Sequence, residues 1–155
     1  MWIGGARAVI LDADKKVLMV KQQQEGRSIW LVPGGGIEAG ENAMQAAIRE
    51  VKEETGLDVD IKALLWHVEE VSEKRGQRFV NFFLAELKGG TLELGTDPER
   101  AEGEQVLSEV RFMSREEISE LEVIYPEYLR DELWHFLSSR TEGYDAFKLR
   151  KNQIK

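Results

Sequence analysis

Short apolar runs separated by polar turns make up the first part of the chain. Residues 7–11 and 17–20 are rich in aliphatic side chains and flank a turn at 12–15, which predicts a β-hairpin. Residues 22–28 are polar and predict a loop. Residues 29–32 predict a short extended segment, because the residue before the proline that follows is disfavoured in the helical region.

The spacing of apolar residues becomes helical from residue 43 to 55. Asn42 can cap the first turn with Gln45 as its capping-box partner, and Gly56 can take the left-handed position after the last turn. Both ends of a helix are therefore predicted from local signals. The residues that share one apolar stripe, which we expect to enter the core, are Met44, Ala47, Ile48 and Val51.

Strand signals predominate after this helix. Residues 59–71 predict a strand with irregular patterning, and residues 106–113 predict another. Residues 79–85 are apolar on both faces and predict an interior strand, covered by helices on both sides of its sheet. Residues 95–103 predict an acidic loop. The fold class is therefore α/β.

Two further helices are predicted near the C-terminus. Ser114 and Glu117 form a capping-box pattern that opens a short helix, and Pro126 can occupy the first position of a longer one. We expect one domain over residues 1–140 and a polar, partly basic, loosely held tail over 141–155. The buried stripe expected in the longer helix comprises Tyr128, Leu129, Leu133, Phe136 and Leu137.

Composition narrows the classes of function. The 155 residues include 21 Lys and Arg, 29 Asp and Glu, and no Cys, with a formal net charge of −8. This charge argues against binding along a nucleic-acid duplex. The lack of cysteine excludes disulfides, thiolate zinc sites and a cysteine nucleophile. No signal peptide and no apolar run of about 18 residues is present, so we expect a cytoplasmic protein that does not enter a membrane.

The predicted helix carries carboxylates on the edge beside its apolar stripe. Glu50 and Glu54 are one turn apart, with Glu53 between them, so we expect their oxygens to converge around a positive charge. Oxygen ligands favour Mg²⁺, Mn²⁺ or Ca²⁺. The small side chains of Ala43 and Ala46 would leave room for a bulky anion. Together these features predict a site for a metal-bound polyphosphate.

The residues before the helix fit the same chemistry. Glycines at 34–36 let the backbone approach an anion or turn a carbonyl towards a metal. Glu41 and Arg49 are eight residues apart in the sequence. A salt bridge between them would require the loop to fold back, and it would fix the loop against the helix.

Residues 35–57 resemble the signature of the Nudix hydrolases, G-x5-E-x7-R-E-U-x-E-E-x-G-U, where U is a bulky aliphatic residue. A chance match somewhere in the chain has a probability on the order of 10⁻⁷. The resemblance implies an α/β/α sandwich with a central mixed β-sheet, and metal-dependent hydrolysis of a nucleoside diphosphate linked to another moiety. The matching positions are Gly35, Glu41, Arg49, Glu50, Val51, Glu53, Glu54, Gly56 and Leu57.

The resemblance also implies roles for individual residues. Glu50 and Glu54 would be the principal metal ligands, joined by the backbone carbonyl of Gly34, and Glu53 would be a further ligand or the catalytic base. In some family members the base is a glutamate from a later loop, for which Glu104 and Glu102 are ranked ahead of Glu99. Two to three divalent ions are implied, Mg²⁺ first and Mn²⁺ as an alternative. The residues that would brace the motif are Gly35, Glu41, Arg49 and Gly56.

Residues outside the motif must select the substrate, and the sequence leaves that choice open. Arg7, Arg27, Trp30 and Arg78 are candidates for substrate binding, although surface charge or core packing also accounts for each. The substrate classes that remain are nucleoside triphosphates, including oxidised ones, ADP-ribose or nucleotide sugars, and dinucleoside polyphosphates. A homodimer is plausible for the family. Two other functions compete: a nucleotide-binding or regulatory module of the same fold without turnover, and an acidic Ca²⁺-binding structural domain.

Overall fold

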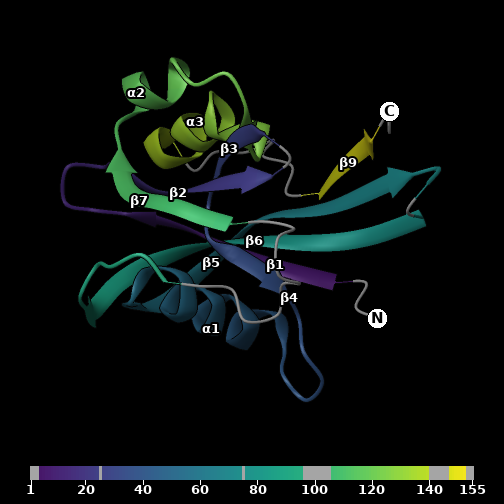
Figure 1. The fold of residues 1–155 in the computed structure, drawn as a ribbon, viewed down its shortest axis with the longest axis horizontal. Helices are drawn as coiled ribbons and strands as arrows, with labels where there is room; N and C mark the ends of the chain where they lie inside the picture. Colours follow the sequence, from purple (N-terminus) through teal and green to yellow (C-terminus); the bar gives the residue numbers. More distant parts are fainter. Residues whose placement is uncertain (1–3, 25, 75, 96–105, 140–146, 153–155) are drawn as a thin grey trace.

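The structure is a computed structural model that describes residues 4–24, 26–74, 76–95, 106–139 and 147–152 (Figure 1). The described strands are β1 (Gly4–Leu11), β2 (Val17–Gln24), β3 (Arg27–Leu31), β4 (Gly34–Gly36), β5 (Leu57–Ser72), β6 (Gly76–Gly90), β7 (Val106–Met113), β8 (Ile124–Tyr125) and β9 (Phe147–Asn152). The described helices are α1 (Ala43–Thr55), α2 (Arg115–Ser119), the 3-10 turn η1 (Glu127–Leu129) and α3 (Glu132–Ser139).

The described strands form a mixed, curled sheet in the order β8-β3-β2-β1-β6-β5-β9. β1 and β2 are paired at Leu11 and Val17, which confirms the predicted hairpin. Beyond this point β1 runs between β6 and β4, while β2 runs between β3 and β7. The sheet therefore opens between β1 and β2, and β4 lies along β1 where β2 has left it.

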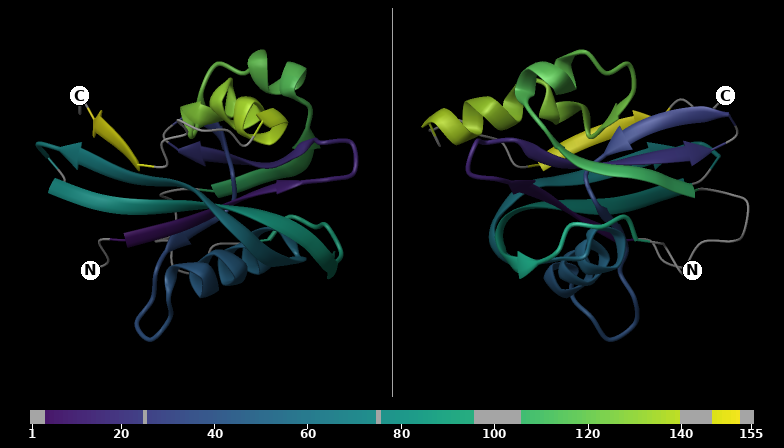
Figure 2. Two further views of the ribbon diagram at one scale, coloured as in Figure 1. Left: turned by 180° about the vertical axis from the view of Figure 1, so that it is seen from behind. Right: turned by 60° about the vertical axis from the view of Figure 1, so that its left-hand side comes forward.

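Helices cover both faces of the sheet. α1 lies on one face and α2 and α3 on the other, as Figure 1 and the two further views in Figure 2 show. Side chains of β1 alternate accordingly: Val9 belongs to the core beneath α3, whereas Ala8 and Ile10 pack towards Val51 of α1. The expected helix layers around a mixed sheet, with residues 79–85 in an interior strand, are confirmed.

The ends of α1 agree with the sequence prediction. The backbone N–H of Gln45 donates to Asn42 Oδ1 at 2.8 Å, and Asn42 N–H donates to Gln45 Oε1 at 2.9 Å. Gly56 has φ of 78° and its N–H donates to the carbonyl of Lys52. These bonds define where the helix begins and ends, and they come from residues within one turn of each end.

The predicted buried stripe of α1 is partly wrong. Met44 and Ile48 are 48% and 38% exposed. The helix instead turns a face of small side chains towards the sheet, and its buried members are Ala46, Ala47, Glu50, Val51, Glu54 and Thr55. Ala46 packs in a core cluster with Ala6 and Phe83, so it brings the helix close to the sheet and leaves no space for an anion there.

Three other boundaries differ from the expectations. The predicted loop over 22–28 is largely paired strand, because β2 continues to Gln24 and β3 begins at Arg27. The single helix expected from Pro126 is divided into η1 and α3, and Pro126 itself is extended, with ψ of 159°. Residues 147–152 of the expected tail form β9, which pairs in parallel with β5. The pairing of β9 with β5 joins segments that are distant in the chain, whereas β2 and β3 pair with each other across the short turn between them.

The junction after α1 yields a stability prediction. Gly56 and Gly76 both have positive φ, at 78° and 77°, but a Cβ at Gly56 would lie 2.3 Å from the carbonyl oxygen of Thr91, while nothing lies within 4 Å of one at Gly76. Gly76→Ala should cost about 1 to 2 kcal/mol for its backbone conformation. Gly56→Ala should cost at least about 1 kcal/mol more, because of the steric clash. Urea unfolding measures both, and equal losses would contradict the close contact with Thr91.

Candidate active site

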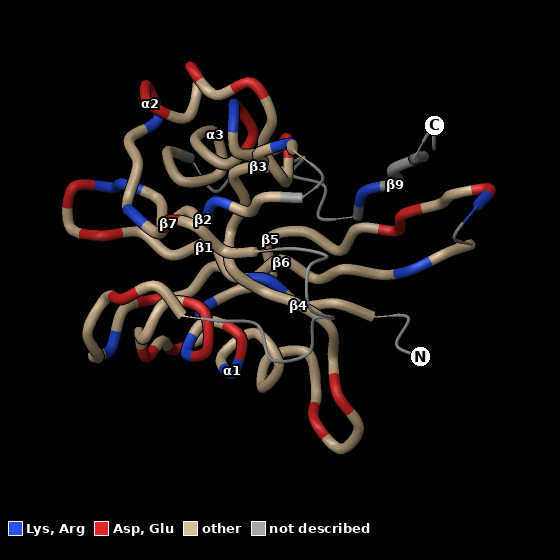
Figure 3. The backbone as a smooth tube through the Cα atoms, viewed as in Figure 1, with Lys and Arg blue, Asp and Glu red and all other residues tan. Residues whose placement is uncertain are grey.

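The motif residues meet where the last two turns of α1 pack against β4. Acidic positions are frequent along α1 and the loop before it (Figure 3). β4 pairs with β1, with Gly35 opposite Ala6. A Cβ at Gly35 would lie 2.5 Å from Glu50 Oε1 and 2.8 Å from Oε2. The β4 backbone therefore rests against the Glu50 carboxylate, and a residue with a side chain at Gly35 would displace it.

Two of the three helix carboxylates are buried. Glu50 is 0% exposed and Glu54 is 5% exposed, whereas the side chain of Glu53 is 29% exposed. Glu54 Oε1 accepts a hydrogen bond from the backbone N–H of Gly34 at 3.2 Å. Buried carboxylates are costly unless hydrogen-bond donors or cations surround them, so this arrangement requires compensating positive charge.

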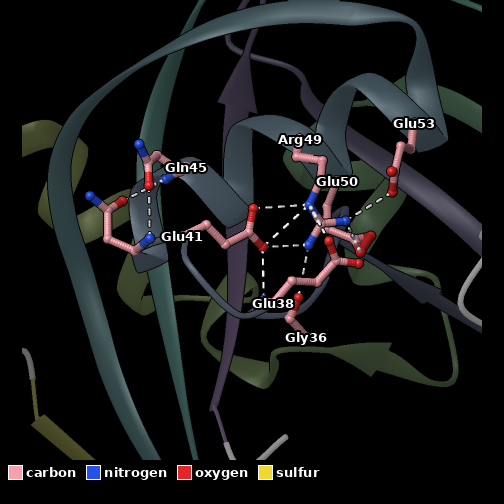
Figure 4. Close-up of polar contacts among 8 residues, drawn as sticks. Gly36, Glu38, Glu41, Gln45, Arg49, Glu50 and Glu53 are labelled. Atoms are coloured by element: carbon pink, nitrogen blue, oxygen red, sulfur yellow. Dashed lines mark hydrogen bonds and ion pairs between the residues drawn. The ribbon is translucent and has the colours of Figure 1, made fainter.

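Arg49 supplies much of that charge (Figure 4). Its Nη1 donates to Glu50 Oε1 and to Glu53 Oε1, both at 3.1 Å. Its Nη2 donates to Glu41 Oε1 at 2.7 Å and to the carbonyl of Gly36 at 3.0 Å. The ion pair suggested by the spacing of Glu41 and Arg49 is therefore present, and the same guanidinium also joins the helix to β4.

Arg49 and Glu41 shift each other's pKa values. Hydrogen bonding from Arg49 is the largest cause that lowers the pKa of Glu41. The hydrogen bond with Glu41 is also the largest cause that raises the pKa of Arg49, opposed by desolvation and aided by the charges of Glu50 and Glu53. Both groups are consequently ionised at neutral pH, and the pair is a permanent charge contact there.

The predicted convergence of all three carboxylates is not what the structure shows. Within the described part of the chain, no group of three or more acidic or histidine side chains is positioned to hold a metal ion. Arg49 draws the oxygens of Glu50 and Glu53 to itself, while Glu54 turns to Gly34. The donor chemistry nevertheless fits a hard divalent cation, because carboxylate oxygens and a close glycine backbone are the ligands that such ions take.

Arg7 is the proposed substrate-binding residue that lies beside the motif. It is opposite Gly34 in the β1–β4 pairing, and its Nη1 donates to the carbonyl of Val32 at 2.7 Å. Its guanidinium carbon lies 5.4 Å from the centre of the Tyr125 ring. A cation held over an aromatic face in this way is pre-positioned and partly desolvated.

Arg78 connects to the same ring through a buried acid. Its Nε donates to Glu70 Oε1 at 2.6 Å, and the Tyr125 hydroxyl donates to Glu70 Oε2 at 2.5 Å. The Glu70 side chain is fully buried. Burial is the largest cause that raises the pKa of Tyr125, so its hydroxyl stays protonated as a donor. Sequence reasoning missed Glu70 and Tyr125, because nothing local links residues so far apart in the chain.

The remaining candidates are placed elsewhere. Trp30 is 8% exposed and belongs to the core, with Lys21 and Arg111 over its ring. Arg27 is exposed at the start of β3, beside the turn from β2. Glu99, Glu102 and Glu104 lie outside the described residues. Arg7 is thus the substrate candidate that the structure brings next to β4.

Sequence reasoning also missed the segment that closes the end of α1. The backbone N–H groups of Glu93 and Gly95 donate to the carbonyls of Thr55 and Glu54, at 2.9 and 2.8 Å. The glycine at 95 was the one local signal of a close approach.

None of the helices in the described ranges has the length and apolar character needed to span a membrane.

A family model and several curated proteins match the sequence of this chain. The family model described as NUDIX domain matches residues 1–137. An ADP-ribose pyrophosphatase from Methanocaldococcus jannaschii is 35% identical over 95 residues, which cover 60% of this chain and 56% of that protein. The 8-oxo-dGDP phosphatase NUDT18 of Mus musculus is 40% identical over 92 residues, covering 58% of this chain and 27% of that protein. The matched regions therefore span about half or less of these relatives.

Solved structures show the same fold. The crystal structure of a UDP-X diphosphatase superposes with a TM-score of 0.67 at 18% identity, covering 96% of this chain and 67% of that one. A NUDIX hydrolase from Nitrosomonas europaea also has a TM-score of 0.67, at 22% identity, covering 96% and 78%. With a family model matched from residue 1 to residue 137 and this architecture, the chain belongs to the Nudix hydrolase family.

Proposed function

We propose that this protein is a divalent-metal-dependent pyrophosphohydrolase that cleaves a nucleoside diphosphate linked to another moiety. The observation that carries the proposal is the packing of α1 against β4, which buries Glu50 and Glu54 beside a glycine backbone and leaves Glu53 at the rim. A solvated acidic helix face would have no reason to bury two carboxylates. Their burial supports a functional site.

Glu50, Glu54 and the carbonyl of Gly34 would hold the metal, with Glu53 as a further ligand. All are oxygen donors, which favours Mg²⁺, with Mn²⁺ as the alternative. When bound, a divalent ion supplies charge neutralisation at the phosphates and makes a bound water a better nucleophile. Arg49 would keep Glu50 and Glu53 oriented from the side of the loop.

Glu53 is the candidate base that the structure describes. Its side chain is partly exposed and is held by Arg49 Nη1, so it can accept a proton from an attacking water without leaving the site. Glu102 and Glu104 stay as alternative bases. The leaving phosphate would depart in line, so the protein's task is mainly to position and neutralise.

Arg7 would contact the substrate near the phosphates or the nucleoside. Its guanidinium is fixed between the Val32 carbonyl and the Tyr125 ring, on the opposite side of β4 from Glu54. Arg78 would act less directly, because its Nε is paired with Glu70, which also accepts a hydrogen bond from the Tyr125 hydroxyl. The planar guanidinium of Arg7 suits a phosphate group of the substrate.

The relatives suggest the substrate class. One is named an ADP-ribose pyrophosphatase and another an 8-oxo-dGDP phosphatase, and both printed substrates contain a nucleoside diphosphate. ADP-ribose or nucleotide sugars, nucleoside triphosphates including oxidised ones, and dinucleoside polyphosphates all contain that unit. We propose a cytoplasmic role for the enzyme, with which the cysteine-free composition is compatible.

A substrate panel tests the proposal directly. With Mg²⁺ or Mn²⁺, at least one nucleoside diphosphate derivative should be hydrolysed with release of a nucleoside monophosphate, and chelation should abolish turnover because the phosphates then lack charge neutralisation. kcat/KM across the three substrate classes ranks them. Nucleotide binding without turnover in any metal would instead support the regulatory module. Calcium binding without nucleotide binding would support a structural domain.

Replacing the carboxylates tests their assignment. Glu53→Gln and Glu54→Gln should each lower kcat by roughly 10²-fold or more, because the amide keeps the shape and the hydrogen bond but loses the charge. Glu120→Gln, at an exposed position just after α2, is the matched control and should keep wild-type turnover. Circular dichroism checks the fold. Wild-type kcat in both site variants would remove the assignment.

The contact between Glu41 and Arg49 is expected to brace the loop of the motif. Glu41 Oε1 also accepts from the backbone N–H of Glu38 at 2.9 Å, while Arg49 holds the Gly36 carbonyl. The side chains of Glu41 and Arg49 are 16% and 21% exposed. Their interaction is therefore less screened than that of a surface pair.

A double-mutant cycle measures this brace. Glu41→Gln and Arg49→Gln should show a coupling energy of about 1 to 2 kcal/mol. The exposed pair Lys52 and Asp58, at 3.2 Å with side chains 54% and 51% exposed, should show less than about 0.5 kcal/mol. Because the folded-state pKa of Glu41 is lowered, its contribution is present above the unfolded pKa and is lost as the pH falls through the folded one. Equal coupling in both pairs, or coupling that persists below that pH, would contradict a brace.

A further inference from the structure

The last turn of α1 depends on a segment from outside the motif. A helix leaves its last four carbonyls without intrahelical partners. In α1 these are the carbonyls of residues 52–55, and Gly56 N–H donates to the first of them, that of Lys52, at 3.0 Å. The next two bonds come from residues 91–95, called here the crossing segment, which follows β6 and passes over the helix end.

The crossing segment makes two backbone hydrogen bonds with the helix end. Glu93 N–H donates to the Thr55 carbonyl at 2.9 Å, and Gly95 N–H donates to the Glu54 carbonyl at 2.8 Å. Both carbonyls belong to the turn that carries Glu53 and Glu54. The backbone of the crossing segment therefore restrains the part of the helix from which two of the three site carboxylates project.

Gly95 allows this contact through its lack of a side chain. A Cβ at this position would lie 1.7 Å from the carbonyl oxygen of Glu53, 2.8 Å from its carbonyl carbon and 3.1 Å from that of Glu54. Contacts under 3.0 Å are not tolerated, so the two backbones would have to separate by more than about 1.3 Å. Gly95 is not among the glycines with positive φ, so proximity to Glu53 explains the glycine and backbone conformation does not.

Packing does not hold the crossing segment in place by itself. Leu92, Glu93 and Leu94 are exposed, whereas Ala47 and Val51 bury the earlier turns of α1. A side chain at Gly95 would therefore push the segment away and break its bond to Glu54, or shift the last turn of the helix. In either case the backbone of Glu53 and Glu54 loses the restraint that the crossing segment provides, while the start of α1 stays packed.

We propose that Gly95 is a positioning residue for the metal-binding carboxylates, acting through its backbone contact with Glu53 and Glu54. The proposal rests on the proposed function, because it assigns Glu53 and Glu54 to the metal site. It extends that function to a residue outside the Nudix motif, on the segment after β6. The alternative to this proposal is a purely structural role, in which Gly95 stabilises the helix end without affecting the geometry of the site.

The test compares Gly95→Ala with two glycine variants. Gly89→Ala is the close control, because a Cβ there would meet Asp58 Oδ2 alone, at 3.9 Å. Gly76→Ala is the destabilised control, because its φ of 77° disfavours alanine at the turn between β5 and β6, away from α1. The measurements are the free energy of unfolding in urea, the Kd of Mn²⁺ by calorimetry without nucleotide, and kcat and KM for the best substrate. All are made where each variant is folded.

Gly95→Ala should raise the Kd of Mn²⁺ about 10-fold and lower kcat about 10²-fold, with KM changed less than about 3-fold, because misplaced ligands weaken the metal site more than nucleotide binding. Gly89→Ala and Gly76→Ala should keep the wild-type Kd and kcat. Unchanged Mn²⁺ affinity and kcat in folded Gly95→Ala would overturn the proposal. So would an equal loss in Gly76→Ala, because it would show a general effect of stability.

The Mn²⁺ measurement separates this proposal from the proposed function. If the wild type binds Mn²⁺ without hydrolysing any substrate, the hydrolase assignment fails, and a selective loss of affinity in Gly95→Ala still supports positioning by Gly95. If the wild type hydrolyses a substrate and Gly95→Ala behaves as Gly89→Ala does, positioning fails and the hydrolase assignment stands. A wild type that binds no Mn²⁺ would overturn positioning of a metal site.

Discussion

The guanidinium of Arg49 is the contact on which the site depends. It joins Glu41 of the loop, the Gly36 carbonyl of β4, and the carboxylates of Glu50 and Glu53 on its own helix. A cation that binds all of these at once offsets the cost of burying Glu50 and ties three chain segments together. Arginine suits this role because its planar group presents several donors in fixed directions.

Close contacts at small residues also position the carboxylates of α1. Gly35 brings β4 against Glu50, and Gly95 brings the crossing segment against Glu53. A side chain at Gly35 would displace the Glu50 carboxylate, and one at Gly95 would separate the two backbones, so both glycines allow a close approach to the helix. Ala46 and Ala47 have the same effect where α1 meets the sheet, because their small side chains are fully buried. The carboxylate geometry is thus set by small residues around it.

A second polar network lies on the other side of β4. Arg7, opposite Gly34, holds the Val32 carbonyl and faces the Tyr125 ring, and Tyr125 is bonded to the buried Glu70. The opening between β1 and β2 accommodates β4 between the two networks. The two networks are built alike, because each pairs a buried carboxylate with an arginine: Arg49 donates to Glu50 on the α1 side, and Arg78 donates to Glu70 on the side of Tyr125.

Much of the fold could be predicted from local signals. The bounds of α1 depend on Asn42, Gln45 and Gly56, which bond to residues within one turn, so the sequence was sufficient there. The capping box at Ser114 was predicted for the same reason, and the strand over 106–113 was predicted from its own residue pattern. The spacing of the motif also identified the family, because its positions lie in one continuous stretch from β4 through α1 to the first residue of β5.

Tertiary packing decided the rest. An amphipathic pattern predicted Met44 and Ile48 inside, but the approach of β4 and Arg49 made the carboxylate side of α1 the buried one. The strand over 147–152 and the contact at Gly95 depend on segments distant in the chain, and no local pattern encodes them. The sequence by itself determined which helix forms and what chemistry it carries. The tertiary structure determined which face of that helix is buried and how closely its neighbours approach, because both follow from contacts between residues far apart in the sequence.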